Sequence, residues 1–274
     1  MRPLTSLLRS SAAAALLVLA ACANGPAVAS GGNDLRLEPV PINRLDEESL
    51  QRGARTFVNY CLNCHTAKYM RYSRLTDIGL TEAQIRDNLM FATDKIGETM
   101  TVAMPAIDAK GWFGVPPPDL SVEARIRGSD WLYNYFLGFY KDDGAPSGWN
   151  NLVFPNVAMP HVLWVQGGIN RLQTTEYEDH EKAQAAAIAV RQLVMVAPAA
   201  GDAVEVRTLV PETPGTMKPE EYRAMVADLV NYLDYMGEPA RNQRINVGLA
   251  VLIFLGVLFL FAYLLKREYW RDVH

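Results

Sequence analysis

The sequence predicts a mainly α-helical protein in which one exported domain is followed by a single transmembrane helix. Apolar or small residues recur at helical spacing over residues 50–58 and again over 225–233, which indicates two helices near the two ends of the domain. Residues 245–265 contain no charged side chain and are long enough to cross a bilayer as one helix. About 210 residues precede this span after an N-terminal export signal, enough for one globular domain with its own core.

The N-terminus has the pattern of a signal peptide over residues 1–29. Two arginines precede a short apolar stretch at residues 12–21, and Ala27-Val28-Ala29 provides a cleavage site of small residues. Cys22 follows Leu-Ala-Ala, which also resembles a lipoprotein processing box in which this cysteine would be lipidated. Cleavage near Ala29 is favoured, because a membrane anchor already exists at the other end of the chain.

The segment Cys61-Leu62-Asn63-Cys64-His65 has the spacing of a covalent attachment site for a c-type haem. In such a site the sulfurs of Cys61 and Cys64 form thioethers to the haem, and the imidazole of His65 binds the iron. A pair of cysteines could also form a disulfide or half of a zinc site. The chain has only one other cysteine, Cys22, so it lacks the second pair that would complete a zinc site. The motif therefore predicts one covalent haem c and a function in electron transfer, without a catalytic acid, base or nucleophile.

The helix that leads into this motif and a second helix over residues 219–237 are arranged as in class I c-type cytochromes, which the domain resembles. In that class a glycine eight residues and a phenylalanine four residues before the first haem cysteine lie where the two helices cross. Gly53 and Phe57 occupy these positions. Because a glycine lets two backbones approach closely, we expect Leu229 and Tyr232 of the second helix to pack against Gly53.

The sixth ligand of the iron must come from a distant part of the chain. The segments Ala103-Met104-Pro105 and Ala158-Met159-Pro160 both place a methionine before a proline, which favours the extended backbone of a ligand loop. His161 offers an imidazole two positions after Met159, and His180 is a more remote and exposed option. The spacing of these residues does not distinguish between the two methionines.

Further motifs resemble those of the cytochrome c1 family, the membrane-anchored haem subunits of cytochrome bc1 complexes. The resemblance covers nearly all of the exported region, and besides the haem motif it rests on Pro117-Pro118-Asp119-Leu120-Ser121, Ala124-Arg125, Trp131-Leu132-Tyr133 and Phe154-Pro155-Asn156-Val157-Ala158-Met159-Pro160. It implies a class I cytochrome c-like domain with insertions, in which Met159 rather than Met104 is the distal iron ligand and Arg125 pairs with a haem propionate. Two features depart from the family: His161 directly follows the methionine–proline pair, and residues 166–216 match poorly and suggest an insertion with extended structure over 204–209.

The resemblance also implies the function. The haem would accept an electron from the Rieske iron–sulfur protein, after quinol oxidation at cytochrome b, and pass it to a c-type cytochrome. The chain would thus be an enzyme only as a subunit of ubiquinol–cytochrome c reductase, in a complex that the resemblance suggests is dimeric. A free-standing anchored carrier that serves a terminal oxidase or reductase is the alternative, but it would need only about half of this length. A haem-based sensor would require an open iron site and an output domain.

The distribution of charge indicates the kind of partner and the orientation in the membrane. The formal charge of −4 becomes −7 when the two signal arginines and the charged tail, which together carry +3, are left out, so nucleic acid is not an expected partner. Lys266, Arg267 and Arg271 follow the apolar span and predict a cytoplasmic C-terminus in a bacterial inner membrane. The expected organisation is a signal peptide (1–29), a periplasmic haem domain (30–240), an anchor helix (241–266) and a cytoplasmic tail (267–274).

Overall fold

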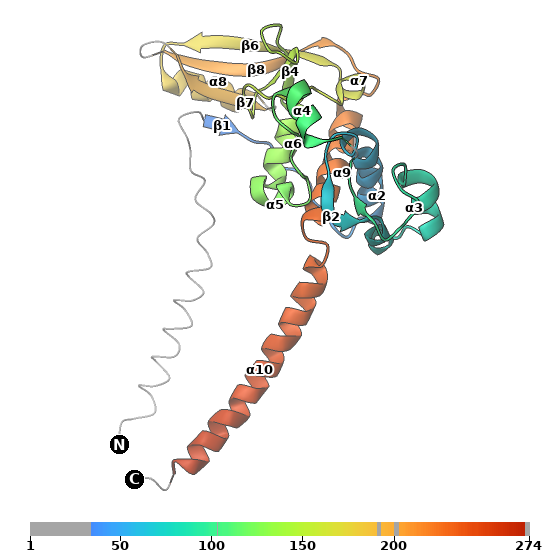
Figure 1. The fold of residues 1–274 in the computed structure, drawn as a ribbon. Helices are drawn as coiled ribbons and strands as arrows, with labels where there is room; N and C mark the ends of the chain where they lie inside the picture. Colours follow the sequence, from blue (N-terminus) through green and yellow to red (C-terminus); the bar gives the residue numbers. More distant parts are fainter. Residues whose placement is uncertain (1–33, 103, 191–192, 200–202, 272–274) are drawn as a thin grey trace.

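The structure is a computed structural model that describes residues 34–102, 104–190, 193–199 and 203–271. It has a domain from which one long helix extends (Figure 1). The predicted signal peptide and the alternative lipidation site Cys22 lie outside the described residues.

Two crossing helices form the centre of the domain. Helix α2 (Glu47–Thr56) begins after Asp46, whose carboxylate caps it by accepting from the Ser49 amide, and it packs against α9 (Pro219–Gly237). A methyl group on Gly53 would lie 2.1 Å from the backbone oxygen of Asp228 and 2.7 Å from Cβ of Tyr232, so the predicted close approach is confirmed for Tyr232, while Asp228 rather than Leu229 provides the nearest atom. The rings of Phe57 and Tyr232 lie 5.5 Å apart at the same crossing. The crossing fixes the end of α2, from which the haem motif continues.

Shorter elements surround this crossing and complete its hydrophobic core. The α2 helix passes directly into a π-helical turn, η1 (Phe57–Cys61), and the following chain forms a small two-stranded sheet of β2 (Ala67–Arg71) and β3 (Thr99–Met100). Helical segments occupy the rest of this half: η2 (Tyr72–Ile78), α3 (Glu82–Leu89), α4 (Ala106–Phe113), α5 (Glu123–Arg127) and α6 (Ser129–Leu137). Helices α5 and α6, which form walls of the site, pack on α9.

A four-stranded antiparallel sheet, with the order β1-β7-β8-β6, forms the other half of the domain. Its strands are β1 (Asp34–Arg36), β7 (Val194–Pro198), β8 (Val204–Thr213) and β6 (Ile169–Tyr177). The prediction of extended structure over 204–209 is confirmed by β8, but the sequence reasoning did not predict the sheet. Helix α8 (His180–Ala189) covers one face of it through Ala183 and Ala187.

The opposite face of the sheet packs against the helical half. Leu193, Met195 and Ala197 of this face lie against Trp131 and Tyr135, which belong to α6. Two further elements join the halves on that side: the hairpin of β4 (Phe139–Lys141) and β5 (Trp149–Asn151), and the short helix α7 (Trp164–Gly167). The insertion therefore supports α6 from behind, and α6 in turn forms a wall of the site.

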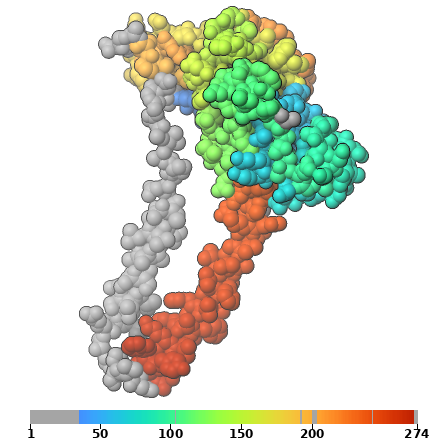
Figure 2. All heavy atoms as spheres, viewed as in Figure 1, coloured from blue at the N-terminus to red at the C-terminus, as the bar shows by residue number. Residues whose placement is uncertain are grey.

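The C-terminal helix α10 (Arg241–Tyr269) follows α9 after a short break and runs away from the domain (Figures 1 and 2). Its segment Gln243–Tyr269 has a mean hydropathy of 2.8, and none of it is buried against the rest of the chain. The predicted apolar span is thus one continuous helix with the length and composition to cross a bilayer.

Candidate functional site

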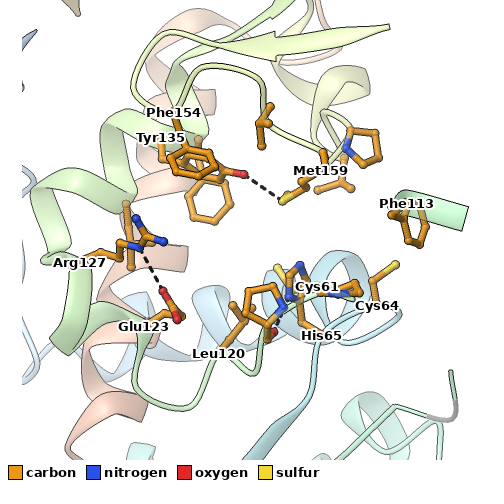
Figure 3. A pocket seen from close by; sticks show the side chains of 18 of the residues that line it. Cys61, Cys64, His65, Phe113, Leu120, Glu123, Arg127, Tyr135, Phe154 and Met159 are labelled. Carbon is orange, nitrogen blue, oxygen red and sulfur yellow. Dashed lines mark hydrogen bonds and ion pairs between the residues drawn. The ribbon is translucent and has the colours of Figure 1, made fainter. Parts of the chain in front are cut away.

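A mainly apolar cavity of about 410 Å³ lies between the haem motif and the loop that carries Met159. Figure 3 shows Cys61, Cys64 and His65 on one wall and Met159 across the cavity from them. Four of the five sequence-predicted site residues therefore line one cavity, and the fifth, Arg125, does not. The remaining walls come mainly from the 113–120 segment, α5, α6 and the 154–162 loop.

The imidazole of His65 is held in one orientation. Its Nδ1 lies 2.8 Å from the backbone oxygen of Pro118, and because a carbonyl can only accept, Nδ1 carries the proton and donates. Burial lowers the pKa of His65, which favours the neutral ring. Nε2 is then unprotonated and available as an iron ligand.

The carboxylate of Asp119 holds the segment that contains Pro118. It accepts hydrogen bonds from Thr66 Oγ1 at 2.7 Å, from the Lys68 amide at 2.9 Å and from the Ser121 amide at 2.9 Å. Burial opposes the charge of Asp119, but the Ser121 hydroxyl together with these hydrogen bonds holds its pKa below the usual value. The Pro-Pro-Asp-Leu-Ser motif therefore orients His65 through the backbone oxygen of Pro118.

The two cysteines are free thiols at the end of η1 and just after it. The amides of Cys64 and His65 both donate to the backbone oxygen of Cys61, at 3.1 and 2.9 Å, and this turn brings the three side chains to the same wall. Burial, together with the neighbouring Cys64, raises the pKa of the Cys61 thiol to about 12. Within the described residues, no three His, Cys, Asp or Glu side chains gather as a group that could hold a metal ion.

Met159 lies opposite the haem motif, where its sulfur accepts a hydrogen bond from the hydroxyl of Tyr135 at 3.4 Å. Burial raises the pKa of the Tyr135 phenol, which therefore remains protonated as a donor. The sequence reasoning missed Tyr135, although its position four residues after Trp131 places both rings on the same side of α6.

The alternative distal ligands lie elsewhere. Met104 is not among the described residues that line the cavity. His161 is buried outside the cavity, with its ring stacked on Phe139 at 4.8 Å and edge-on to Trp149 at 5.2 Å, and burial lowers its pKa to about 4. His180 is exposed at the start of α8, as the sequence reasoning expected.

Arg127, rather than the predicted Arg125, places a guanidinium at the cavity. Arg125 points to Glu238, with 3.7 Å between Nη1 and Oε2, and its side chain is 56% exposed. Arg127 pairs with Glu123 at 3.5 Å and lies over the ring of Trp131, 4.7 Å from its centre. Residues 123 and 127 are four apart and share one face of α5, whereas residue 125 lies on the other face. The sequence reasoning missed Arg127 because it did not apply this helical phase.

The residues of the cavity fit a covalent haem c. Two thiols, one imidazole nitrogen and one thioether are the donor groups that such a haem uses, and the walls are apolar, as its macrocycle requires. The guanidinium of Arg127, beside its partner Glu123, lines the cavity and could pair with a carboxylate of the haem.

Comparisons with known proteins show that the chain is similar to cytochromes c1. A family model described as "Cytochrome C1 family" matches residues 39–101 and 92–273. The chain is 45% identical to cytochrome c1 of Allochromatium vinosum, over 90% of this chain and 93% of that protein. It is 46% identical to a Nitrosomonas europaea protein described as an ammonia monooxygenase gamma subunit, over 89% of this chain and 92% of that protein. Cytochrome c1 of Rhodospirillum rubrum is 28% identical, over 84% of each chain.

Proposed function

The chain belongs to the cytochrome c1 family, and on this basis we propose that Cys61 and Cys64 attach its haem c while His65 and Met159 bind the iron. As a member of that family it is a membrane-anchored electron-transfer subunit of a cytochrome bc1 complex and binds haem c covalently. This favours the bc1 subunit over the free-standing carrier.

The observation that supports the ligand pair most strongly is that His65 and Met159 lie on opposing walls of one cavity, with the two thiols beside His65. His65 has Nε2 free because its Nδ1 donates to Pro118. A haem held by His65 and Met159 would supply a one-electron iron couple, and its methionine ligand would raise the reduction potential. The fixed imidazole and the apolar walls therefore suit electron transfer.

Arg127 is the better candidate for pairing with a haem propionate. Its guanidinium lines the cavity and is held there by Glu123 and by the ring of Trp131. The exposed Arg125 is paired with Glu238 instead. A guanidinium matches a carboxylate in a bidentate pair, so Arg127 would both bind the haem edge and offset its negative charge.

Membership of the complex implies cytochrome b and the Rieske iron–sulfur protein as partners. We further propose that the domain lies in the periplasm, that electrons leave to a c-type cytochrome in a dimeric ubiquinol–cytochrome c reductase, and that residues 1–29 are removed as a signal peptide. The basic residues Lys266 and Arg267 in the last turn of α10 support a cytoplasmic C-terminus.

Two matched variants of the full chain test the ligand assignment after haem attachment has been verified. Met159→Leu removes the proposed distal ligand, and Met104→Leu removes the methionine of the similar segment that does not line the cavity. We expect the ferric absorption band that reports a sulfur–iron bond to disappear in Met159→Leu and to persist in Met104→Leu. Persistence of the band in Met159→Leu would mean that another residue is the ligand.

A further inference from the structure

The hydroxyl of Tyr135 makes a polar contact with the proposed iron ligand. It donates to Met159 Sδ at 3.4 Å, which is within the range of a hydrogen bond to sulfur, and both side chains line the cavity. In Figure 3 the hydroxyl points to the sulfur from the α6 side. The hydrogen bond joins two side chains of the protein and does not depend on a bound group.

Aromatic packing fixes the position of the Tyr135 ring. The ring of Trp131 is stacked on it, with centres 5.1 Å apart and planes inclined by 11°. The ring of Phe139 meets it edge-on at 5.2 Å, and the backbone oxygen of Tyr135 accepts from Asn151 Nδ2 at 2.7 Å. A side chain held on these sides loses little further freedom when its hydroxyl bonds the sulfur.

The rings around Tyr135 also contact Arg127 and His161. Trp131, which is stacked on Tyr135, also carries the guanidinium of Arg127 over its ring, 4.7 Å from the ring centre. Phe139, which touches Tyr135, is also stacked on His161 just after Met159. The loop is thus held through the Met159 sulfur and through His161.

A hydrogen bond to a thioether has two consequences for a metal ligand. The sulfur has two lone pairs, so a donor that occupies one of them leaves the other available to the iron. The donor also withdraws electron density from the sulfur, which weakens its bond to ferric iron more than its bond to ferrous iron. Both consequences depend on the hydroxyl and not on the ring.

We propose that Tyr135 is a positioning residue for Met159, which orients the sulfur toward the iron and raises the reduction potential of the haem. This inference rests on the proposed assignment of Met159 as a ligand. It adds a residue that acts on the iron through its ligand, in the way that hydrogen bonds around a metal site tune the metal.

The test compares Tyr135→Phe with Tyr133→Phe in the full chain with haem attached. Phenylalanine keeps the ring that packs on Trp131, so only the hydroxyl is lost. Tyr133 is a matched control because it is on the same helix, is 6% exposed and does not line the cavity. In Tyr135→Phe we expect the ratio of ferrous to ferric haem at a fixed applied potential to fall about two- to fivefold. At 59 mV per tenfold change, this is a decrease of about 20–40 mV.

The outcomes separate this inference from the ligand assignment. If Met159→Leu loses the sulfur–iron band and Tyr135→Phe keeps the parent potential, Met159 is the ligand and the role of Tyr135 is refuted. An equal shift in Tyr133→Phe would also refute it, because the effect would then not depend on contact with the sulfur. If Met159→Leu retains the band, the ligand assignment itself fails. A lower potential in Tyr135→Phe alone supports the inference.

Discussion

Replacing Gly53 by alanine tests the helix crossing on which the haem motif depends. The new Cβ would lie 2.1 Å from the backbone oxygen of Asp228 and 2.7 Å from Cβ of Tyr232. A carbon–oxygen contact normally needs more than about 3 Å, so α2 and α9 would have to separate by about 1 Å. Neither obstacle can rotate away, since one is backbone and the other is the first atom of a buried side chain.

The expected loss of stability follows from two opposing effects. Overpacking of a core costs about 1–3 kcal/mol, and the rigid obstacles place this site near the upper end. Alanine in place of glycine favours the helix by about 1 kcal/mol. We therefore expect Gly53→Ala to lower the free energy of unfolding by about 2 kcal/mol.

Denaturant unfolding of the full chain in detergent, followed by tryptophan fluorescence, measures this change. Gly111→Ala is the matched control, because Gly111 also lies in a helix, α4, and a methyl group there would meet no atom within 4 Å. The control should be unchanged or more stable by up to about 1 kcal/mol. Equal stability of Gly53→Ala and the parent chain would refute the close crossing.

The remaining predictions concern the residues around the cavity. Asp119→Ala should lower the free energy of unfolding by about 1–3 kcal/mol and weaken the orientation of His65, because three hydrogen bonds to Asp119 hold the segment of Pro118. Since the folded pKa of Asp119 is depressed, this stabilisation is present near neutral pH and is lost as the pH falls through that pKa. If the stabilities of parent and variant fall in parallel during an acid titration, the prediction is contradicted. Arg127→Gln should lower the reduction potential of the haem, because it removes a cation at the cavity and so shifts the free-energy difference between the two oxidation states by about 1 kcal/mol in favour of ferric haem. Arg125→Gln should change the potential less in the same redox titration, and the reverse order would restore Arg125 as the propionate partner.

The sequence was most informative where a local pattern determines the chemistry. The haem motif and its helix are contiguous, and the spacing of Gly53 from Cys61 matches that of class I c-type cytochromes, which predicted the crossing that α2 and α9 make. The membrane-spanning helix was equally predictable, because an apolar stretch as long as residues 245–265 is typical of a transmembrane helix. These predictions rested on neighbouring residues or on one well-defined spacing compared with a known class.

Features that depend on distant contacts were not predictable in this way. Strand β1 pairs with β7, about 160 residues later in the chain, and no turn sequence joins the two. The choice between Arg125 and Arg127 depends on the phase of the five-residue helix α5, which has no side-chain cap to mark its start. Tyr135 gains its contact with Met159 only when the ligand loop folds back over α6.

The binding of carbon monoxide to reduced haem in the full chain tests most directly whether the protein fills both axial positions of the iron. The absorption spectrum of the parent chain should not change when the gas is added, because His65 and Met159 as the two proposed ligands would leave no open position. The Met159→Leu variant, with its haem still attached, should give a carbonyl spectrum. Rapid binding of carbon monoxide by the parent chain would contradict the assignment of this cavity to electron transfer through a haem with two protein ligands.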